Sequence, residues 1–135
     1  MTSERNKARA LELFDRVMNG HDLGALDEFT SNPAVVRSAT GLLRAFPDLE
    51  AEVWWIVAEG DMTVAFIHIR GTHQGPWLFV EEPTGRHVET SFMLAFRFDD
   101  DSQIVDLWLG SNFVEILTQL GWGFAPTEAV QPAPE

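Results

Sequence analysis

Residues 49–72 read LEAEVWWIVAEGDMTVAFIHIRGT, and this segment determines the architecture of the chain. It is rich in Val, Ile and Trp, which are residue types that favour extended strands. Gly60-Asp61 interrupts it near its middle, as a hairpin turn does. We therefore predict two antiparallel strands, Leu49–Glu59 and Asp61–Thr72, each of about ten residues or longer.

Two more strands are expected further along the chain. Residues 71–85 contain Gly and Pro and are predicted to form a long loop. His87–Phe98 has the composition of a third long strand, and Gln103–Asn112 that of a fourth. The polar segment Asp99–Ser102 between them predicts a tight turn.

Helices are expected before and after these strands. Residues 4–19 carry apolar side chains at helical spacing, with charged residues on the other side. Asp22 is predicted to cap a short second helix, and a third helix starts next to Pro33 and stops before Pro47. A short helix over residues 113–120 closes the ordered part of the chain.

Helices first and strands afterwards predict the α+β class, with the N-terminal helices packed on one face of an antiparallel four-stranded sheet. A long sheet that only three short helices cover must curve strongly, which leaves a cone with an apolar interior and one open end. Residues 1–124 are expected to form a single domain. Residues 125–135 contain three prolines and are expected to form a disordered tail.

The composition excludes several classes of function. The chain has 135 residues and no cysteine, which removes thiolate nucleophiles, thiolate metal sites and disulfides. Its formal net charge of -12 disfavours nucleic acid and anionic membranes, since proteins bind these by neutralising phosphates. The longest strictly apolar run, residues 53–58, is too short to span a membrane. We expect a soluble, cytoplasmic protein.

Large apolar side chains are expected to line the cone as substrate-binding residues. Plain core packing is the alternative for most of them. Five tryptophans in so small a domain nevertheless favour a pocket or an interface, because a buried Trp needs a partner for its N–H. The predicted lining residues are Trp54, Phe66, Trp77, Phe92, Leu94 and Trp108.

Several polar residues are candidates for catalysis. His73 follows a strand end, where loops often carry function, and His68 lies mid-strand, either as a satisfied core residue or as a pocket donor. Asp106 and Glu89 lie inside strands, and either faces solvent or has a raised pKa inside an apolar cone. Asp106 shares a strand face with Trp108 if no bulge intervenes. The spacing of the histidines fits no metal site, so we predict no metal.

Six short motifs stand in a fixed order between residues 45 and 121. They are AFPDL (45–49), VAEGD (57–61), RGTHQG (70–75), PTGRHVE (83–89), IVDLW (104–108) and QLG (119–121). In this order and spacing they resemble the SnoaL-like polyketide cyclases of the NTF2-like superfamily. The resemblance implies an NTF2-like cone with a deep pocket and a homodimer packed through the outer sheet. It also implies ring closure in an apolar, polyketide-type molecule without a cofactor.

One departure from the family concerns the catalytic residue. In members that close a ring by an intramolecular aldol step, an acidic residue four positions after the strand-four Trp is the general acid/base. Counted from Trp108, that position is Asn112. An amide does not shuttle protons at neutral pH, although it donates a hydrogen bond to an enolate or carbonyl oxygen. Either another of the polar residues named above supplies the base, or the reaction needs none.

A second departure lies upstream, where Thr30–Pro33 stands in place of a longer polar His-Asn element and shortens one pocket wall. The leading hypothesis is a cofactor-independent cyclase or isomerase of a biosynthetic pathway. The alternative is a non-catalytic small-molecule-binding or dimerisation module on the same fold. A water-activating epoxide hydrolase ranks third, because Arg70, Arg97 and Asp106 form only part of the network it needs.

Overall fold

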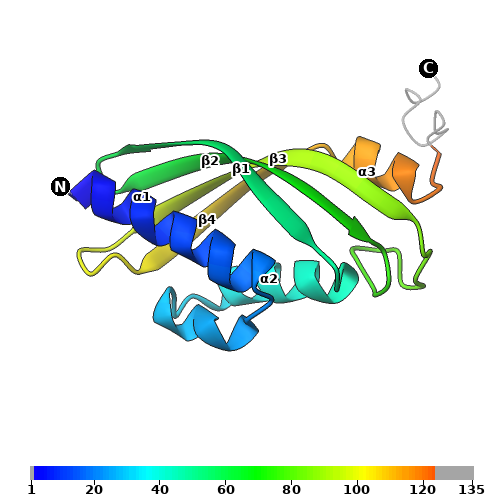
Figure 1. The fold of residues 1–135 in the computed structure, drawn as a ribbon, viewed down its shortest axis with the longest axis horizontal. Coiled ribbons are helices and arrows are strands. Elements are labelled where there is room, and N and C mark those ends of the chain that lie inside the picture. The colour runs from blue at the N-terminus through cyan, green and yellow to red at the C-terminus, as the bar shows by residue number, and fades with distance from the viewer. Residues whose placement is uncertain (1, 124–135) are drawn as a thin grey trace, which may run out of the picture.

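The computed structural model describes residues 2–123, which form a curled antiparallel sheet with helices against one face (Figure 1). The sheet has the order β1-β2-β3-β4 and is not closed into a barrel. Its strands are β1 (Glu50–Glu59), β2 (Met62–Thr72), β3 (His87–Phe98) and β4 (Ile104–Ser111). The predicted α+β class and the four antiparallel strands are confirmed.

The predicted hairpin between β1 and β2 is also confirmed. Glu59 pairs with Met62, and Gly60 turns the chain with a φ of +59°, a left-handed conformation that glycine adopts without strain. The fourth strand ends one residue earlier than expected, at Ser111. The short helix α3 (Phe113–Gln119) follows it directly.

The N-terminal helices match the expected boundaries with two differences. The predicted helix 4–19 is α1 (Thr2–Leu13), which continues as the π-helical turn η1 (Phe14–Asn19). The second helix is the 3-10 helix η2 (Leu23–Glu28). Asp22 is its N-cap residue, as predicted, but the Asp22 side chain makes no capping hydrogen bond. The third, α2 (Pro33–Ala45), has Pro33 in its first turn, as predicted.

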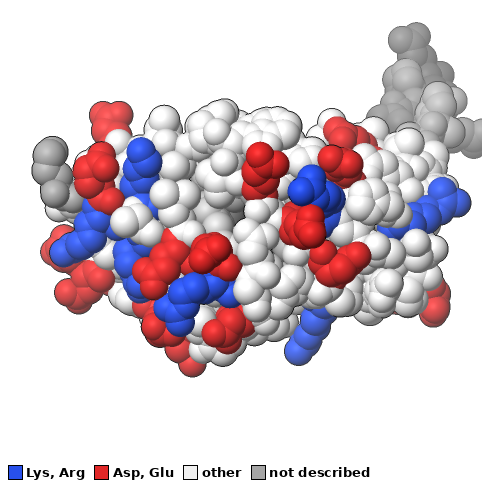
Figure 2. Space-filling view, in the orientation of Figure 1, with Lys and Arg blue, Asp and Glu red and all other residues white. Residues whose placement is uncertain are grey.

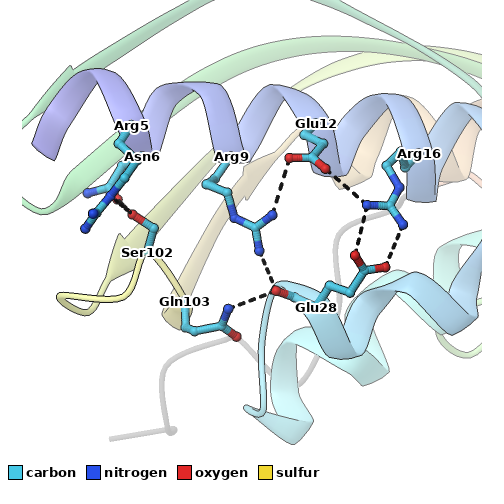
Figure 3. A network of polar contacts seen from close by, with 8 residues as sticks. All are labelled: Arg5, Asn6, Arg9, Glu12, Arg16, Glu28, Ser102 and Gln103. Atoms are coloured by element: carbon cyan, nitrogen blue, oxygen red, sulfur yellow. Dashed lines mark hydrogen bonds and ion pairs between the residues drawn. The ribbon is translucent and has the colours of Figure 1, made fainter. Parts of the chain in front are cut away.

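Polar contacts fix α1 across one end of the sheet (Figure 3). Arg5 donates from Nε to Ser102 Oγ at 2.7 Å, and Ser102 Oγ donates to the buried Asn6 Oδ1 at 2.7 Å. Arg16 pairs with the Glu28 carboxylate of η2 at 2.6 Å. These contacts join α1 to the β3–β4 turn and η1 to η2, so the helices cannot slide over the sheet without breaking them.

Burial alternates along β2 and β3 and divides the sheet into two faces. We call the side that packs against α1, η1 and α2 the inner face. On it, Ile67 is 0% exposed, and the ring of Phe96 stacks on Phe14 of η1 at 5.9 Å. The opposite, outer face has no helix packed on its centre in the described part of the chain, and several of its large apolar side chains are exposed.

Charge is distributed unevenly over the surface. In the view of Figure 2, most charged side chains gather over α1 and the segment below it, and broad uncharged areas lie elsewhere. Among the described helices, none is long and apolar enough to cross a membrane. The expected disordered tail, residues 125–135, lies outside the described residues.

Candidate functional site

A cavity of about 110 Å³ lies between the inner face of the sheet and the N-terminal helices. Strands β2, β3 and β4 form its roof, α2 forms one wall, and the end of α1, η1 and η2 close it from the N-terminal side. The lining residues are Leu13, Met18, Leu26, Val35, Ser38, Ala39, Leu42, Leu43, Ile69, Trp77, Phe92, Leu94, Phe96, Leu107, Leu109, Ser111 and Phe113.

Strand register explains which side chains of β4 face this cavity. Leu107 pairs with Phe96, Leu109 with Leu94, and Ser111 with Phe92, all of which lie on the inner face. Because side chains alternate along a strand, the residues between them point to the outer face. The cavity roof is therefore the regular continuation of the hydrophobic core.

The lining contains no ionisable side chain among the residues that the structure describes. Its two polar side chains are Ser38 on α2 and Ser111 at the end of β4. The Ser111 hydroxyl oxygen is buried and has no hydrogen-bond partner among residues 2–123. The cavity can therefore enclose an apolar molecule and offer it one unpaired hydroxyl, and residues 2–123 contribute no general acid or base to its lining.

The mouth of the cavity lies beside the edge strand β4. Leu109 and Phe113 line the cavity and are still 47% and 42% exposed, and Ser38 on α2 is exposed as well. Trp77 of the 73–86 loop packs edge-on against Phe46 and lies 6.1 Å from the ring of Phe113. Aromatic and aliphatic side chains therefore form the rim of the cavity.

Three of the six predicted lining residues, Trp77, Phe92 and Leu94, do line the cavity. The expectation is wrong for Trp54, Phe66 and Trp108. Trp54 and Phe66 lie on the outer face. A bulge between Val53 and Trp55 places two consecutive tryptophans on that side. The ring of Trp55 stacks on that of Phe66 at 5.6 Å, and the ring of Trp54 is tilted against it at 5.4 Å.

Trp108 and Asp106 share a face, as expected, but it is the outer one. Trp108 pairs with Ala95 and is 52% exposed. Asp106 pairs with Arg97, whose Nε donates to its carboxylate at 2.7 Å. The inward orientation considered for Asp106 is therefore wrong. The alternation along the strand correctly predicted that Asp106 and Trp108 share a face. It did not show that this face is the outer one, since both faces of the strand carry large apolar residues.

Asn112 does not line the cavity. It is the N-cap of α3, where its Oδ1 accepts a hydrogen bond from the Glu115 backbone N–H at 3.1 Å. Its Nδ2 donates to the Glu115 carboxylate at 3.2 Å, so both polar ends of the amide are engaged. This side chain holds the start of the helix that carries Phe113 to the mouth.

His73 is fully buried and likewise lies outside the lining. Its Nδ1 accepts a hydrogen bond from the Thr84 backbone N–H at 3.1 Å, which makes Nε2 the protonated nitrogen of the neutral ring. Burial lowers the pKa of His73 below its ordinary value. His73 thus anchors the two ends of the 73–86 loop to each other and does not line the mouth.

His68 lies on the outer face between two partners. Its Nε2 is 2.7 Å from a Glu89 carboxylate oxygen, its Nδ1 is 2.9 Å from Ser91 Oγ, and its ring stacks on Trp54 at 4.7 Å. The hydrogen bond from His68 holds the pKa of Glu89 below its ordinary value. Of the alternatives considered for His68, neither a core residue nor a pocket donor describes this position.

Sequence reasoning missed the two serines of the lining. Ser111 could have been found from its alternation with Leu107 and Leu109, had the opposite face of the fourth strand been assigned to the interior. Ser38 carries no comparable signal, because small polar residues are common on helix surfaces. No group of three or more His, Cys, Asp or Glu residues within the described part of the chain is arranged to hold a metal ion.

The family model for SnoaL-like polyketide cyclases matches residues 1–120. The chain belongs to the SnoaL-like polyketide cyclase family. The match includes the first 44 residues, which carry none of the motifs that suggested the resemblance. Among curated proteins, no significant match was found.

Solved structures of similar proteins share this fold. AclR from Streptomyces galilaeus, a proposed hydroxylase, is 29% identical over 95% of this chain and 88% of its own, with a TM-score of 0.76. A proposed SnoaL-like polyketide cyclase from Jannaschia sp. CCS1 is 24% identical over 93% and 95%, also with a TM-score of 0.76. IdmH from Streptomyces antibioticus, a proposed polyketide cyclase, is 25% identical over 87% and 99%, with a TM-score of 0.69.

Proposed function

We propose that this SnoaL-like protein is a cofactor-independent cyclase that closes a ring in an apolar, polyketide-type intermediate held partly inside the cavity. Family membership supports a cyclase-like role. The observation that carries the proposal is the lining itself, which is apolar, open at one end and free of ionisable groups among the described residues. Such a lining selects for shape and not for charge.

The size of the cavity indicates how a substrate would sit. An apolar cavity of about 150 Å³ holds one benzene molecule. The enclosed 110 Å³ therefore takes about one ring, and the rest of a larger molecule rests on the rim formed by Trp77, Leu109 and Phe113. One end of a flexible substrate is held in the cavity while the other end folds back over the rim, and this brings the reacting atoms together. The free energy of binding offsets the conformational entropy that the substrate loses.

The same lining narrows the reaction class. Proton transfer by a positioned side chain requires a titratable group within hydrogen-bond reach of the substrate. The five residues first considered for catalysis, which are Asn112, His73, His68, Asp106 and Glu89, all lie outside the cavity. We therefore infer a ring closure in which the substrate is already reactive and no lining side chain takes up a proton, as in a pericyclic closure. Asn112 and His73 act as positioning residues for α3 and the loop.

A matched pair of variants on α2 tests the proposal. Ala39→Phe adds a ring inside the cavity, whereas Ala34→Phe adds the same ring to the exposed side of the helix. Linear polyketide precursors are incubated with each protein, and products are followed by mass spectrometry. We expect Ala39→Phe to lower turnover at least about tenfold and Ala34→Phe to leave it within about twofold. Equal turnover by both variants would contradict the proposal.

A non-catalytic binding module is the second candidate, favoured by the same absence of ionisable groups from the described lining. It predicts that apolar ring compounds bind and that Ala39→Phe abolishes this binding, with no precursor converted by any variant. Binding measured by titration calorimetry, together with the product analysis, separates the two candidates.

We also propose that the protein is a homodimer packed through the outer face. An apolar stripe crosses all four strands there, and several of its members are exposed, among them Trp54 at 51%, Val57 at 58% and Trp108 at 52%. Charged pairs flank the stripe, Arg97 with Asp106 at one end and Arg70 with Glu50 at the other. Isologous packing of two such faces would cover the stripe.

A further inference from the structure

The unpaired hydroxyl of Ser111 has a consequence for the chemistry of the ligand. Four polar side-chain atoms of the described residues are buried without a hydrogen-bond partner, in Asn6, His73, Thr90 and Ser111. Of these residues, Ser111 lines the cavity and the other three do not. We infer that Ser111 recognises the ligand by donating a hydrogen bond from its Oγ to a carbonyl oxygen of an uncharged ring compound. This inference rests on the proposed function.

The hydroxyl of Ser111 is surrounded by apolar side chains. The residues beside it on the inner face, across β3, β2 and β1, are Phe92, Ile67 and Val53, all of them apolar. A buried hydroxyl without a partner has lost its hydrogen bonds to water, which destabilises the ligand-free protein. A ligand oxygen placed against Oγ restores that bond, whereas a purely hydrocarbon ligand leaves it unmade.

Backbone contacts fix the position of this hydroxyl. Ser111 pairs with Phe92 at the end of β4, and the next residue, Asn112, is held as the cap of α3 by Glu115. The backbone of the serine is therefore held between a strand and a helix start. Rotation about χ1 then places Oγ, and rotation about the Cβ–Oγ bond aims the O–H bond. Such a fixed donor discriminates between ligands better than the exposed hydroxyl of Ser38 at the mouth.

The lining also determines which oxygen-containing functional groups of a ligand can enter the cavity. A carboxylate or phosphate would carry its charge into a lining with no ionisable partner among the described residues, which is strongly unfavourable. A ketone, aldehyde or ester carbonyl is uncharged and accepts the single hydrogen bond on offer. The ligand class is therefore a neutral ring compound whose carbonyl group enters the cavity first.

Two probes of nearly equal shape test this assignment. 2-Acetylnaphthalene carries a ketone, and 2-isopropenylnaphthalene replaces that oxygen with a CH₂ group. Their dissociation constants are measured by protein NMR titration on the wild type and on Ser111→Ala. We expect Ser111→Ala to weaken the ketone about fivefold, as the loss of one net hydrogen bond does, and to leave the hydrocarbon unchanged or tighter.

A further variant serves as the control. Thr90→Val removes a buried hydroxyl that also lacks a partner but does not line the cavity. It is expected to leave the ketone-to-hydrocarbon ratio of affinities unchanged. Thermal melting confirms that each variant is folded.

The outcomes separate this inference from the proposed function. Binding of both probes with equal losses, or with no loss, in Ser111→Ala overturns the role of Ser111 while leaving the cavity as a ligand site. A loss of ketone affinity in Thr90→Val equal to that in Ser111→Ala overturns it as well. Failure of both probes to bind the wild type overturns the inference and the proposed function together.

Discussion

The two faces of the same four strands carry opposite kinds of chemistry. The inner face forms a cavity roof without ionisable groups in the described structure, and Ser111 contributes its polar tip. The outer face carries His68 bonded to Glu89 and Asp106 bonded to Arg97, together with an exposed apolar stripe. The ionisable side chains that the sequence offers as candidates for catalysis therefore lie on the surface, at the proposed subunit contact. The proposed selection by the cavity is by shape.

The strongest test of this division places a charge on each face in turn. Ile67→Asp puts a carboxylate at a site that is 0% exposed, and Val57→Asp puts one at a site that is 58% exposed. We expect Ile67→Asp to destabilise the protein by more than about 4 kcal/mol and to leave it unfolded, because a buried unpaired charge is among the most destabilising changes. Val57→Asp should remain folded. Far-UV circular dichroism during urea titration measures both, and similar stability of the two variants would contradict the assignment of faces.

A substitution of Trp108 tests whether the outer face forms the dimer contact while the inner face binds the ligand. If the outer face holds two copies together, Trp108→Ser removes a large half-exposed ring from that contact without touching the cavity. We expect the dimer dissociation constant to rise at least about tenfold, as for a typical aromatic anchor, while affinity for 2-acetylnaphthalene stays within about twofold. Light scattering after size exclusion measures the first quantity. A monomeric wild type, or loss of ligand binding in the variant, would contradict the proposal.

Substitutions of Asn112 are expected to have a smaller effect, and to change stability where the resemblance to the family suggests a change in catalysis. Asn112→Ala removes an N-cap and is expected to destabilise the protein by about 1 kcal/mol, whereas Asn112→Asp keeps a capping oxygen and should change stability little. Turnover should follow the stability of α3 and fall less than about threefold in either variant. A drop of tenfold or more in turnover by stably folded Asn112→Ala would show a catalytic role instead.

The smallest expected effect is a pH dependence of stability caused by His73. Burial lowers its pKa in the folded protein from the ordinary value of 6.5, so below that pH the unfolded chain binds the proton more readily than the folded one. Stability should therefore fall as the pH drops through and below 6.5. In His73→Asn, whose amide oxygen still accepts from Thr84, this part of the loss should vanish. Urea midpoints of both proteins at about pH 7.5 and about pH 5.5 measure it; identical losses would contradict the account.

Much of the fold could be predicted because local signals and burial agree along the chain. Gly60, Pro33 and the Pro47 stop each mark a boundary that the backbone alone requires, and long β-branched segments predict strands without reference to their partners. The η1 turn was not predicted as π-helical, since the apolar spacing of a π turn differs too little from that of an α-helix in six residues.

The site could be predicted only in part, because which side of a strand faces inward depends on partners that the sequence does not name. Phe92 and Leu94 were assigned correctly from β3, where four of the six outer positions (His87, Glu89, Ser91 and Arg97) are polar or charged. On β4, Trp108 alternates with Leu107 and Leu109, so hydrophobicity cannot choose a side. On β1, the bulge after Val53 moves two tryptophans to one face, which strict alternation cannot produce.

The most direct test of the central claim is methyl NMR of the wild-type protein titrated with 2-isopropenylnaphthalene. The account predicts shift changes at the methyl groups of the inner face, those of Ile69, Leu94 and Leu109, with little change at Val57 and Val64 on the outer face. Shift changes confined to Val57 and Val64 would show that the ligand binds the exposed stripe, and the cavity would then not be the functional site.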